Sequence, residues 1–448
     1  MRARHILRSA SDWRAHAWLS AGLLALGWSG SAAAQQVIDT ELAQAYFAEA
    51  EALGRAARPL WGVGLDGPMI FVDARTREAV ANVVDTLGVL RAVAGVWVGV
   101  LPPEVGVANT ALAWGGRRWT MLVWPLPYGR LSRGQLLVHE MFHRVQPELG
   151  LPGADATNAH LDTEEGRLLL RLEWRALQLA LADTGAARRR ALVDAVWFRW
   201  RRHERFPAGA AEERALELNE GLAEYTGMRV AVPPNARAGW AAVQIENYDA
   251  RAREGAVGRS FAYATGPALG FLLDAADDTW RTRVDGGTDL ARLLAEAYGI
   301  TPGSERGLAE RWGPYDGERL AAEESERSRA IAARDERMRA RFVDSPTLTL
   351  PATEDVRYTF NPGEVVPFGE GGTVYLTTEV RDAWGLLQVT AGGALLIREG
   401  GRIARIILPA PGAGQGDPTR GDGWTLELRD GWELVAGART GDFVVVGR

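Results

Sequence analysis

The sequence has no cysteine, which excludes disulfide bonds, thiolate nucleophiles, thiolate metal ligands and lipid attachment through cysteine. Any bound metal ion must therefore be held by histidine and carboxylate side chains. Basic residues are outnumbered, because 51 Lys and Arg residues face 57 Asp and Glu residues in a chain of 448. Such an acidic chain is not expected to bind nucleic acid, because phosphate recognition needs a basic face. The sequence also lacks a Gly-rich P-loop and a serine nucleophile elbow.

Long apolar runs are missing after residue 34, so no later segment is expected to span a bilayer. The first residues combine four arginines with an uncharged, mostly apolar stretch at 17–30 and small residues at 32–34. This pattern predicts a secretory signal peptide over residues 1–34, with Gln35 starting the mature chain. We therefore expect a secreted or periplasmic protein with no stable membrane span after cleavage. The alternative is a retained membrane anchor, although the apolar stretch is shorter than the ~20 residues that a span needs.

The remaining chain predicts an α+β fold built from successive regions. Residues 60–127 are expected to form a small twisted sheet, because β-like runs occur at 68–73, 95–101, 107–114 and 118–124. Residues 131–343 have mostly helical patterns. From residue 345 to residue 448, short runs rich in Val, Ile, Leu and Thr alternate with Gly, Pro and Asp. We therefore predict one domain over 35–343 and a small all-β domain of sandwich or barrel type over 345–448.

Two of the predicted helices are unusually rich in charge. Residues 188–205 carry many arginines interspersed with aromatic residues, and residues 317–342 are charged on nearly every face. We interpret the first as a solvated helix packed through its aromatic face and the second as a solvated connecting helix. The alternatives are a surface for anionic lipid or nucleic acid on the first helix and a partner site on the second.

The strongest chemical signal is a His-Glu-Met-Phe-His sequence at residues 139–143, on a predicted helix. Ser132 and Gln135 fit a capping box, so this helix is expected to begin at Ser132. Four residues turn a helix by about 400°, so the imidazoles of His139 and His143 share one face and can grip one zinc ion. Glu140 lies beside them, placed to take a proton from a water that the metal activates.

A catalytic zinc site also needs a third protein ligand and an open coordination position. His160, in a predicted loop, and His203, in the arginine-rich helix, have no convincing spacing to the first two histidines. Glu220 and Glu224 are better candidates, because they are four residues apart and share a helical face. One of the two can bind the metal while the other holds a ligand histidine through its second nitrogen.

Together, the His-Glu-x-x-His motif at 139–143 and the Asn-Glu-Gly-Leu-Ala-Glu-Tyr stretch at 219–225 resemble the gluzincin metallopeptidases. The resemblance is closest to their aminopeptidase-N-like branch. It implies a zincin-like domain, and it implies Zn²⁺ bound by His139, His143 and Glu220.

The resemblance also implies supporting residues. Glu224 matches the acidic residue that holds a ligand histidine, and Asn219 lies next to the implied ligand. Tyr263, in a Phe-Ala-Tyr-Ala-Thr-Gly stretch, matches a family tyrosine whose phenol stabilises the oxyanion. An ordinary packed tyrosine is the alternative.

Two features depart from the family pattern. Glu220 follows His143 by 77 residues, much further than is usual, and we expect two inserted helices at 163–183 and 187–205 to fill this gap. The Gly-x-Met-Glu-Asn stretch with which aminopeptidases capture a substrate N-terminus is also missing. Exopeptidase and endopeptidase action therefore both stay open.

The expected function is a secreted or periplasmic zinc peptidase that cleaves peptide or protein substrates. In zincins an edge strand beside the histidine helix pairs with the extended substrate, and residues 118–124 or 107–114 are the candidates. Three tryptophans there either line a cleft or belong to the core: Trp114, Trp119 and Trp124. The alternative function is a non-catalytic binding protein that keeps the zincin scaffold and holds a protein or glycan partner. A chance motif in a helical secreted protein is the third possibility.

Overall fold

The computed structural model describes residues 38–448 apart from 152, 155, 302–306, 362–363, 370–371 and 412–418. The predicted signal peptide at residues 1–34 lies outside the described residues. The described chain forms two units, one ending at Ser328 and the other beginning at Arg329, and it mixes helices with sheets, which confirms the α+β class. Within the part of the chain that the structure describes, no helix has both the length and the apolar composition to cross a membrane.

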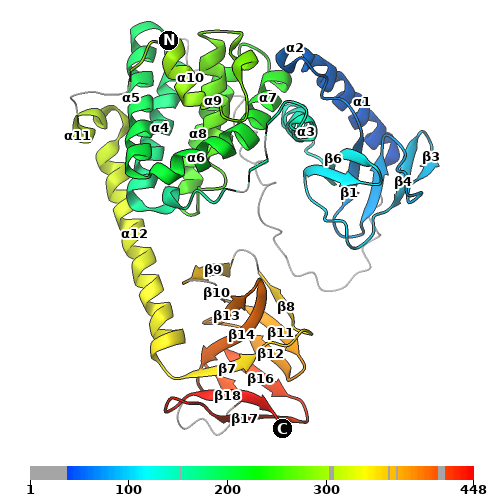
Figure 1. The fold of residues 1–448 in the computed structure, drawn as a ribbon, viewed down its shortest axis with the longest axis vertical. Coiled ribbons are helices and arrows are strands. Elements are labelled where there is room, and N and C mark those ends of the chain that lie inside the picture. Colours follow the sequence, from blue (N-terminus) through cyan, green and yellow to red (C-terminus); the bar gives the residue numbers. More distant parts are fainter. Residues whose placement is uncertain are drawn as a thin grey trace. The chain divides into compact units, whose positions relative to one another are not determined.

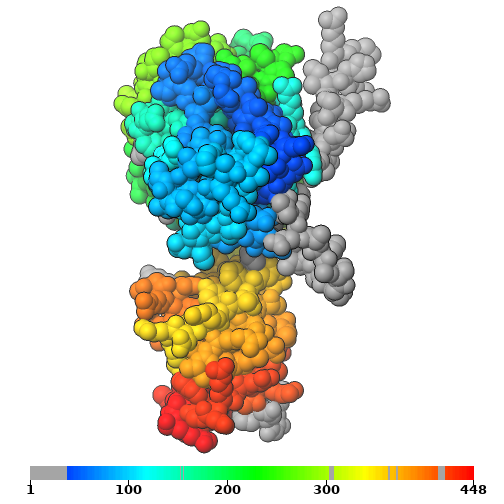
Figure 2. All heavy atoms as spheres, turned by 90° about the vertical axis from the view of Figure 1, so that its right-hand side faces the viewer, coloured from blue at the N-terminus to red at the C-terminus, as the bar shows by residue number. Residues whose placement is uncertain are grey.

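The first unit begins with helix α1 (Thr40–Ala56), short α2 (Arg58–Trp61) and a six-stranded sheet of order β3-β4-β2-β1-β6-β5 (Figure 1). The strands are β1 (Met69–Asp73), β2 (Glu78–Ala81), β3 (Arg91–Val93), β4 (Val96–Val100), β5 (Thr110–Trp114) and β6 (Arg117–Trp124). Phe71 of β1 packs with Phe47 of α1, and β1 is buried throughout, as expected of a central strand covered on both faces. In Figure 2, α1 and this sheet form the blue and cyan face that is turned to the viewer.

The sheet topology decides which of the two strands predicted to bind substrate lies at an edge. Strand β6 lies between β1 and β5, so residues 118–124 are internal and cannot be an edge. Strand β5 lies at the edge of the sheet, within the predicted run 107–114. Trp119 and Trp124 are buried, which favours the core interpretation for both, whereas Trp114 at the end of β5 is only half-buried.

A helical lobe completes the first unit (Figure 1). Its helices are α3 (Arg130–Val145), α4 (Glu164–Ala182), α5 (Gly185–Arg205), α6 (Pro207–Leu216), α7 (Leu222–Ala231), α8 (Arg237–Ala252), α9 (Ala262–Asp274), α10 (Leu290–Ala297) and α11 (Leu308–Arg311). A π-helical turn, Glu217–Gly221, joins α6 to α7. Helices α4 and α5 correspond to the two inserted helices that the long spacing predicted.

The predicted capping box is wrong, although the helix that it announced exists. Helix α3 begins at Arg130 after Gly129, and no side chain caps it. The Gln135 side chain turns into the interior instead and donates to Glu224. A buried charge-assisted hydrogen bond is stronger than an exposed helix cap. The contact with Glu224 therefore determines the orientation of the Gln135 side chain.

The solvated interpretation of the two charged helices is also wrong in part. Arg199 and Arg202 of α5 are buried and form ion pairs with Glu173 of α4. In α12 (Gly317–Arg339), which otherwise keeps most of its charged side chains at the surface, Glu324 is buried and accepts from Arg167 and Arg171, both on α4. Helical periodicity predicts that charged side chains face solvent. It cannot reveal an oppositely charged side chain on another helix.

The second unit consists of the end of α12, a π-helical turn (Ala340–Asp344) and two sheets. The seven-stranded sheet has the order β17-β18-β7-β14-β13-β10-β9, and the five-stranded sheet has the order β15-β16-β12-β11-β8. Their strands are β7 (Thr347–Pro351), β8 (Arg357–Phe360), β9 (Val365–Phe368), β10 (Gly372–Tyr375), β11 (Thr378–Asp382), β12 (Gly385–Val389), β13 (Ala394–Glu399), β14 (Arg402–Pro409), β15 (Arg420–Gly421), β16 (Trp424–Leu428), β17 (Trp432–Ala436) and β18 (Phe443–Gly447). One apolar cluster contains side chains of both sheets, such as Leu350 and Leu387, so the sheets pack face to face.

Candidate metal centre

Three predicted ligands meet in the helical lobe. The Nε2 atoms of His139 and His143 lie 3.0 Å apart, and Oε2 of Glu220 lies 3.2 Å from the first and 3.3 Å from the second. His139 is only 5 % exposed, and the other two side chains are partly buried. No second group of three such side chains with donor atoms this close occurs among the described residues. This group could hold a metal ion.

The donor set fits a zinc ion. A tetrahedral ion with ligands at about 2.1 Å needs donor atoms roughly 3.4 Å apart, close to the observed separations. Two imidazoles and one carboxylate leave one tetrahedral position without a protein ligand, as catalytic zinc sites require.

The electrostatics of the group favour a cation. Burial opposes the charged form of His139, but hydrogen bonds with Glu220 and Glu224 raise its pKa well above the usual range. Burial alone would raise the pKa of Glu220, but contacts with both histidines lower it below the usual range. The buried carboxylates therefore require positive charge beside them, either as protons on imidazole or as a metal ion.

Helix α3 supplies both histidines from one face, as their four-residue spacing predicted. Its opposite face is anchored in the apolar core by buried side chains: Leu137, Val138, Met141, Phe142 and Val145. Because this face is fixed, the helix cannot rotate about its axis without exposing the core. The imidazoles are therefore held in place before any ligand arrives.

Glu220 lies in the π-helical turn, where helix α7 begins. The α9 backbone approaches this turn closely, because a Cβ atom on Gly266 would lie 2.3 Å from the Cα atom of Gly221. Only glycine fits such a contact. Helix α7 also approaches α3 through Gly227, where a Cβ atom would lie 2.6 Å from the Gln135 carbonyl oxygen. Side chains of α3, the turn and α9 are thereby brought to one point.

Helices α4 and α5 support the same turn. Arg199 of α5 donates to both carboxylate oxygens of Glu217, the first residue of the turn, at 2.7 and 2.6 Å. The same guanidinium donates to Glu173 of α4 at 2.8 Å. Because a bidentate ion pair fixes orientation as well as distance, α4 and α5 define where the turn begins. The long spacing between His143 and Glu220 therefore contributes to the site.

Glu224 orients His139. Its Oε2 atom lies 2.9 Å from Nδ1 of His139, which leaves Nε2 of the imidazole for the metal position. Its Oε1 atom accepts from Gln135 at 2.7 Å and from Gln244 of α8 at 2.6 Å. The carboxylate is thus held by two amides. Asn219, the other supporting residue implied by the resemblance, donates to Oε1 of Glu220 at 3.0 Å.

Gln146 orients His143, and sequence reasoning missed it. Its Oε1 atom lies 2.7 Å from Nδ1 of His143, and its side-chain nitrogen donates to the carbonyl oxygens of Leu218 and Asn219 at 3.3 and 3.0 Å. The amide therefore connects the end of α3 to the π-helical turn. The available signal was its position three residues after His143 on the same helical face.

Tyr263 of α9 contacts the ligand group. Its hydroxyl donates to Oε2 of Glu220 at 2.6 Å, and its ring stacks on His139 with 5.5 Å between centroids. Burial raises the pKa of the phenol far above its usual range, and the neighbouring Glu220 carboxylate adds to this effect. The phenol therefore keeps its proton and remains a hydrogen-bond donor.

Glu140 is buried, and its Oε2 atom has no hydrogen-bond partner among the described residues. Burial raises the pKa of this carboxyl group, while the nearby His139 and His143 oppose the shift. A buried carboxylate without a partner costs free energy, so native proteins rarely keep one without a function. Glu140 is thus a buried carboxyl group with one unpaired oxygen, directly after His139 in the sequence.

The two other histidines considered as ligands lie elsewhere. Nε2 of His160 is 2.7 Å from one oxygen of Glu213, and Nε2 of His203 is 3.0 Å from the other. Glu213 also accepts two hydrogen bonds from Arg202. Both histidines therefore belong to the buried charge cluster of the helical lobe.

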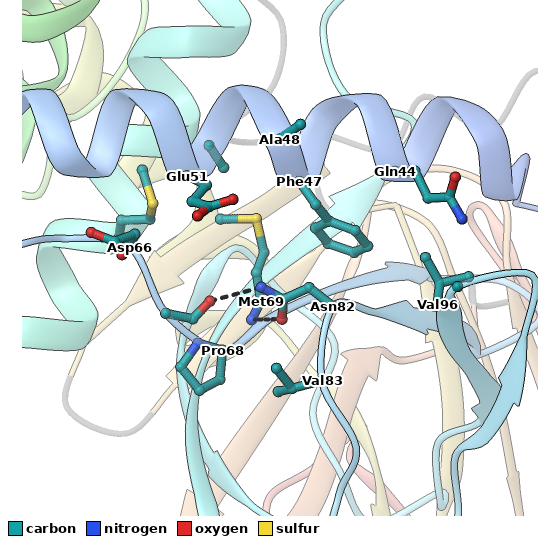
Figure 3. A pocket seen from close by; sticks show the side chains of 14 residues that line it. Gln44, Phe47, Ala48, Glu51, Asp66, Pro68, Met69, Asn82, Val83 and Val96 are labelled. Carbon is teal, nitrogen blue, oxygen red and sulfur yellow. Dashed lines mark hydrogen bonds between the residues drawn. The ribbon is translucent and has the colours of Figure 1, made fainter.

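A separate cavity of about 500 Å³ lies between α1 and the first sheet (Figure 3). Phe47 and Glu51 extend from α1 towards Met69 and Asn82 on its other side, and Asp66 lies beside α1. The Asn82 side chain accepts from the Met69 amide and donates to the Gly67 carbonyl, so it is already used within the fold.

The comparisons with known proteins yield no relative: no protein-family model, no curated protein and no solved structure matches this chain.

Proposed function

We propose that this protein is a secreted or periplasmic zinc peptidase with a zincin-like catalytic domain. The observation that carries the proposal is the meeting of His139, His143 and Glu220 beside a buried carboxylate, Glu140, that has an unpaired oxygen. These are the residue types of a hydrolytic zinc site, and each has the role that its position allows. The extracellular location is inferred from the residue pattern at 1–34.

The three ligands and their partners define the metal position. His139 and His143 would hold zinc through Nε2, because their Nδ1 atoms are occupied by Glu224 and Gln146. When bound, zinc would polarise the substrate carbonyl and lower the pKa of a water molecule.

Glu140 would act as the general base and then as the general acid. Its free oxygen would accept a proton from the attacking water and then deliver it to the nitrogen of the leaving amine. The carboxylate can do so because no other described side chain occupies that oxygen. His139, His143 and Glu220 lie close enough to Glu140 to influence its charge, which supports a place for this carboxylate beside the metal position.

Tyr263 would stabilise the charge that develops on the substrate oxygen. Its hydroxyl is a permanent donor and currently donates to Glu220, so it can transfer this hydrogen bond to a nearby oxyanion. Stacking on His139 restrains the ring in this position. The contribution of such a donor is about 10²–10³ in turnover.

Strand β5 offers a place for an extended substrate. It neighbours α3, and its outer edge pairs with no strand among the described residues. A peptide added along this edge would gain main-chain hydrogen bonds beside the histidine helix. A peptide or protein is therefore the proposed substrate.

The deciding experiment measures zinc content and peptide hydrolysis in the wild type and in Glu140→Gln. We expect one bound zinc in both proteins, and a turnover at least ~100-fold lower in the variant. Full activity in Glu140→Gln would remove Glu140 from the mechanism. Bound zinc without hydrolysis of a broad peptide library, even in the wild type, would instead favour the non-catalytic scaffold that binds a protein or glycan partner.

The ligand assignment has its own test. Glu220→Ala is expected to release zinc, whereas Glu224→Ala keeps both imidazoles and the Glu220 carboxylate and loses only part of the affinity. The opposite result would exchange the roles of the two glutamates.

A further inference from the structure

The second unit carries an exposed aromatic cluster at the end of one sheet. Strand β8 is the edge of the five-stranded sheet, and its Tyr358 and Phe360 are register partners of Val380 and Thr378. Both partners are buried, so the two rings share the inner face of the sheet. There they meet Tyr375 of β10 from the other sheet. Figure 1 shows β8 and β10 at the end of this unit opposite β17 and β18.

The three rings are packed in a fixed arrangement. Tyr358 and Phe360 are nearly parallel, with 18° between their planes and 5.6 Å between centroids, and Tyr375 meets both edge-on. Phe360 is nevertheless 42 % exposed, although it lies on the inner face. The fold therefore keeps a rigid aromatic surface at the solvent boundary, where ring faces can receive a ligand at little entropic cost.

Arg398 of β13 adds a positive charge to this surface. Its guanidinium donates to the Tyr358 hydroxyl at 2.7 Å and to the Tyr375 hydroxyl at 3.5 Å, and to the Gly401 carbonyl oxygen at 3.4 Å. All three partners are neutral, and no carboxylate of the described residues forms an ion pair with Arg398. Other arginines in this unit, such as Arg381, pair with a glutamate. Within the described residues, Arg398 therefore has no carboxylate partner, and its guanidinium lies over the Tyr358 ring.

A cavity of about 570 Å³ begins at Tyr358 and Arg398 and is also lined by Thr353, Glu354, Arg402 and Ile403. Glu354 and Arg402 lie 3.5 Å apart and balance each other, which leaves the charge of Arg398 for a ligand. This volume is in the range of small-molecule sites. From the cavity, the aromatic surface continues through Tyr358 to Phe360, so the site has room for several linked units.

We propose that this surface binds an acidic saccharide. The C–H groups of a pyranose ring would stack on Phe360, the exposed ring of the cluster, and a sugar carboxylate would pair with Arg398, which lies over the Tyr358 ring. The acidic balance of the chain makes a polyphosphate such as nucleic acid a poor match. This binding does not depend on the proposed peptidase activity.

The test measures binding of hexagalacturonate, a uronic acid oligosaccharide, to the full-length protein by isothermal titration calorimetry. Wild type is expected to bind it at least about tenfold more tightly than the carboxyl-reduced, neutral form, because one charge-assisted hydrogen bond is lost in the latter. Arg398→Met is expected to remove this preference. Phe360→Ala is expected to lower the affinity for both oligosaccharides by about tenfold, which is the scale of a lost stacking contact. Because Phe360 and Arg398 are not fully buried, the variants should fold, and their thermal melting provides the check.

Matched control variants distinguish a specific binding site from a general effect of removing an exposed aromatic or charged side chain. Trp200→Ala removes an exposed aromatic from α5, and Arg292→Ala removes an exposed arginine from α10; both should bind like wild type. Glu140→Gln should also bind like wild type, so a failure of the peptidase proposal would leave this result unaffected. The proposal is overturned if hexagalacturonate does not bind, if Phe360→Ala and Arg398→Met bind it unchanged, or if an acidic peptide competes for the same residues more tightly.

Discussion

The helical lobe and the second unit, called the strand unit below, differ in the side chains that they bury. Arg199 and Arg202 of the lobe are fully enclosed with Glu173, Glu213 and Glu217, whereas the described strands of the second unit bury no arginine. There the core consists of aliphatic and aromatic side chains of the two sheets. Apolar contacts are tolerant of direction, whereas guanidinium–carboxylate pairs fix it. Around Arg199, the buried charges thus hold the π-helical turn in one orientation.

The same comparison predicts how the helical lobe and the second unit respond to single substitutions. A buried ion pair gains little over an apolar pair of similar volume, because two charges must leave water. Removing one partner is nevertheless costly, because the other charge stays behind. The lobe should therefore be more sensitive to single substitutions at its charges than the strand unit is to trimming its core.

The largest expected effect is that of Arg199→Met. It would leave Glu173 and Glu217 without their cation and lower the free energy of unfolding of the lobe by about 3–5 kcal/mol. Amide hydrogen exchange, resolved for each unit, measures this loss. The control is Arg292→Ala, whose exposed pair with Glu296 contributes about 0.3–0.5 kcal/mol. A loss for Arg199→Met no larger than the loss for Leu387→Ala would remove the contrast between the units.

A smaller effect is expected for Leu387→Ala in the strand unit. Leu387 is fully buried between the sheets, and truncation of such a side chain typically costs about 2–5 kcal/mol; we expect about 3. The same hydrogen-exchange measurement should show the loss in residues 345–448 alone. Zinc affinity should not change, and a parallel loss of zinc would mean that the two units are energetically coupled.

The smallest effect concerns the orientation of a ligand. Gln146→Ala removes the acceptor at Nδ1 of His143 and the link to the π-helical turn, and zinc affinity should fall about 10–100-fold. Competition with a chelator of known affinity measures the change. Gln178→Ala, which loses only a hydrogen bond to the Ala242 carbonyl, is the matched control. Equal affinities in the two variants would show that Gln146 has no orienting role.

Local patterns predicted the parts of the site that lie on one helix. The four-residue spacing of His139 and His143 was sufficient, because a helix fixes which residues share a face. Glu220 and Glu224 could be proposed as a pair from their four-residue spacing, but only the resemblance chose Glu220 as the ligand, because it follows His143 by 77 residues. The metal-binding roles themselves stay predictions, but the two motifs do meet in space.

Contacts between distant helices could not be predicted. Gln135 fits a cap in the sequence, yet its partner is Glu224, which lies 89 residues away. The arginines of α5 look solvent-facing for the same reason, because Glu173 and Glu217 lie on other elements. A single sequence indicates whether a side chain prefers a helix cap or a solvent-facing position. The free energy of burial with a distant partner overrides that preference.

The π-helical turn at Glu217–Gly221 also has a consequence for deletions. A π turn accommodates one residue more than an α-helical turn, and each residue of an α-helix adds about 100° of rotation. Loss of Leu218 or Asn219 would make the run from α6 to α7 regular and rotate Glu220 by about 100° relative to Glu217, away from the imidazoles whenever Glu217 stays on Arg199. Length, and not only composition, is therefore under constraint in this five-residue segment.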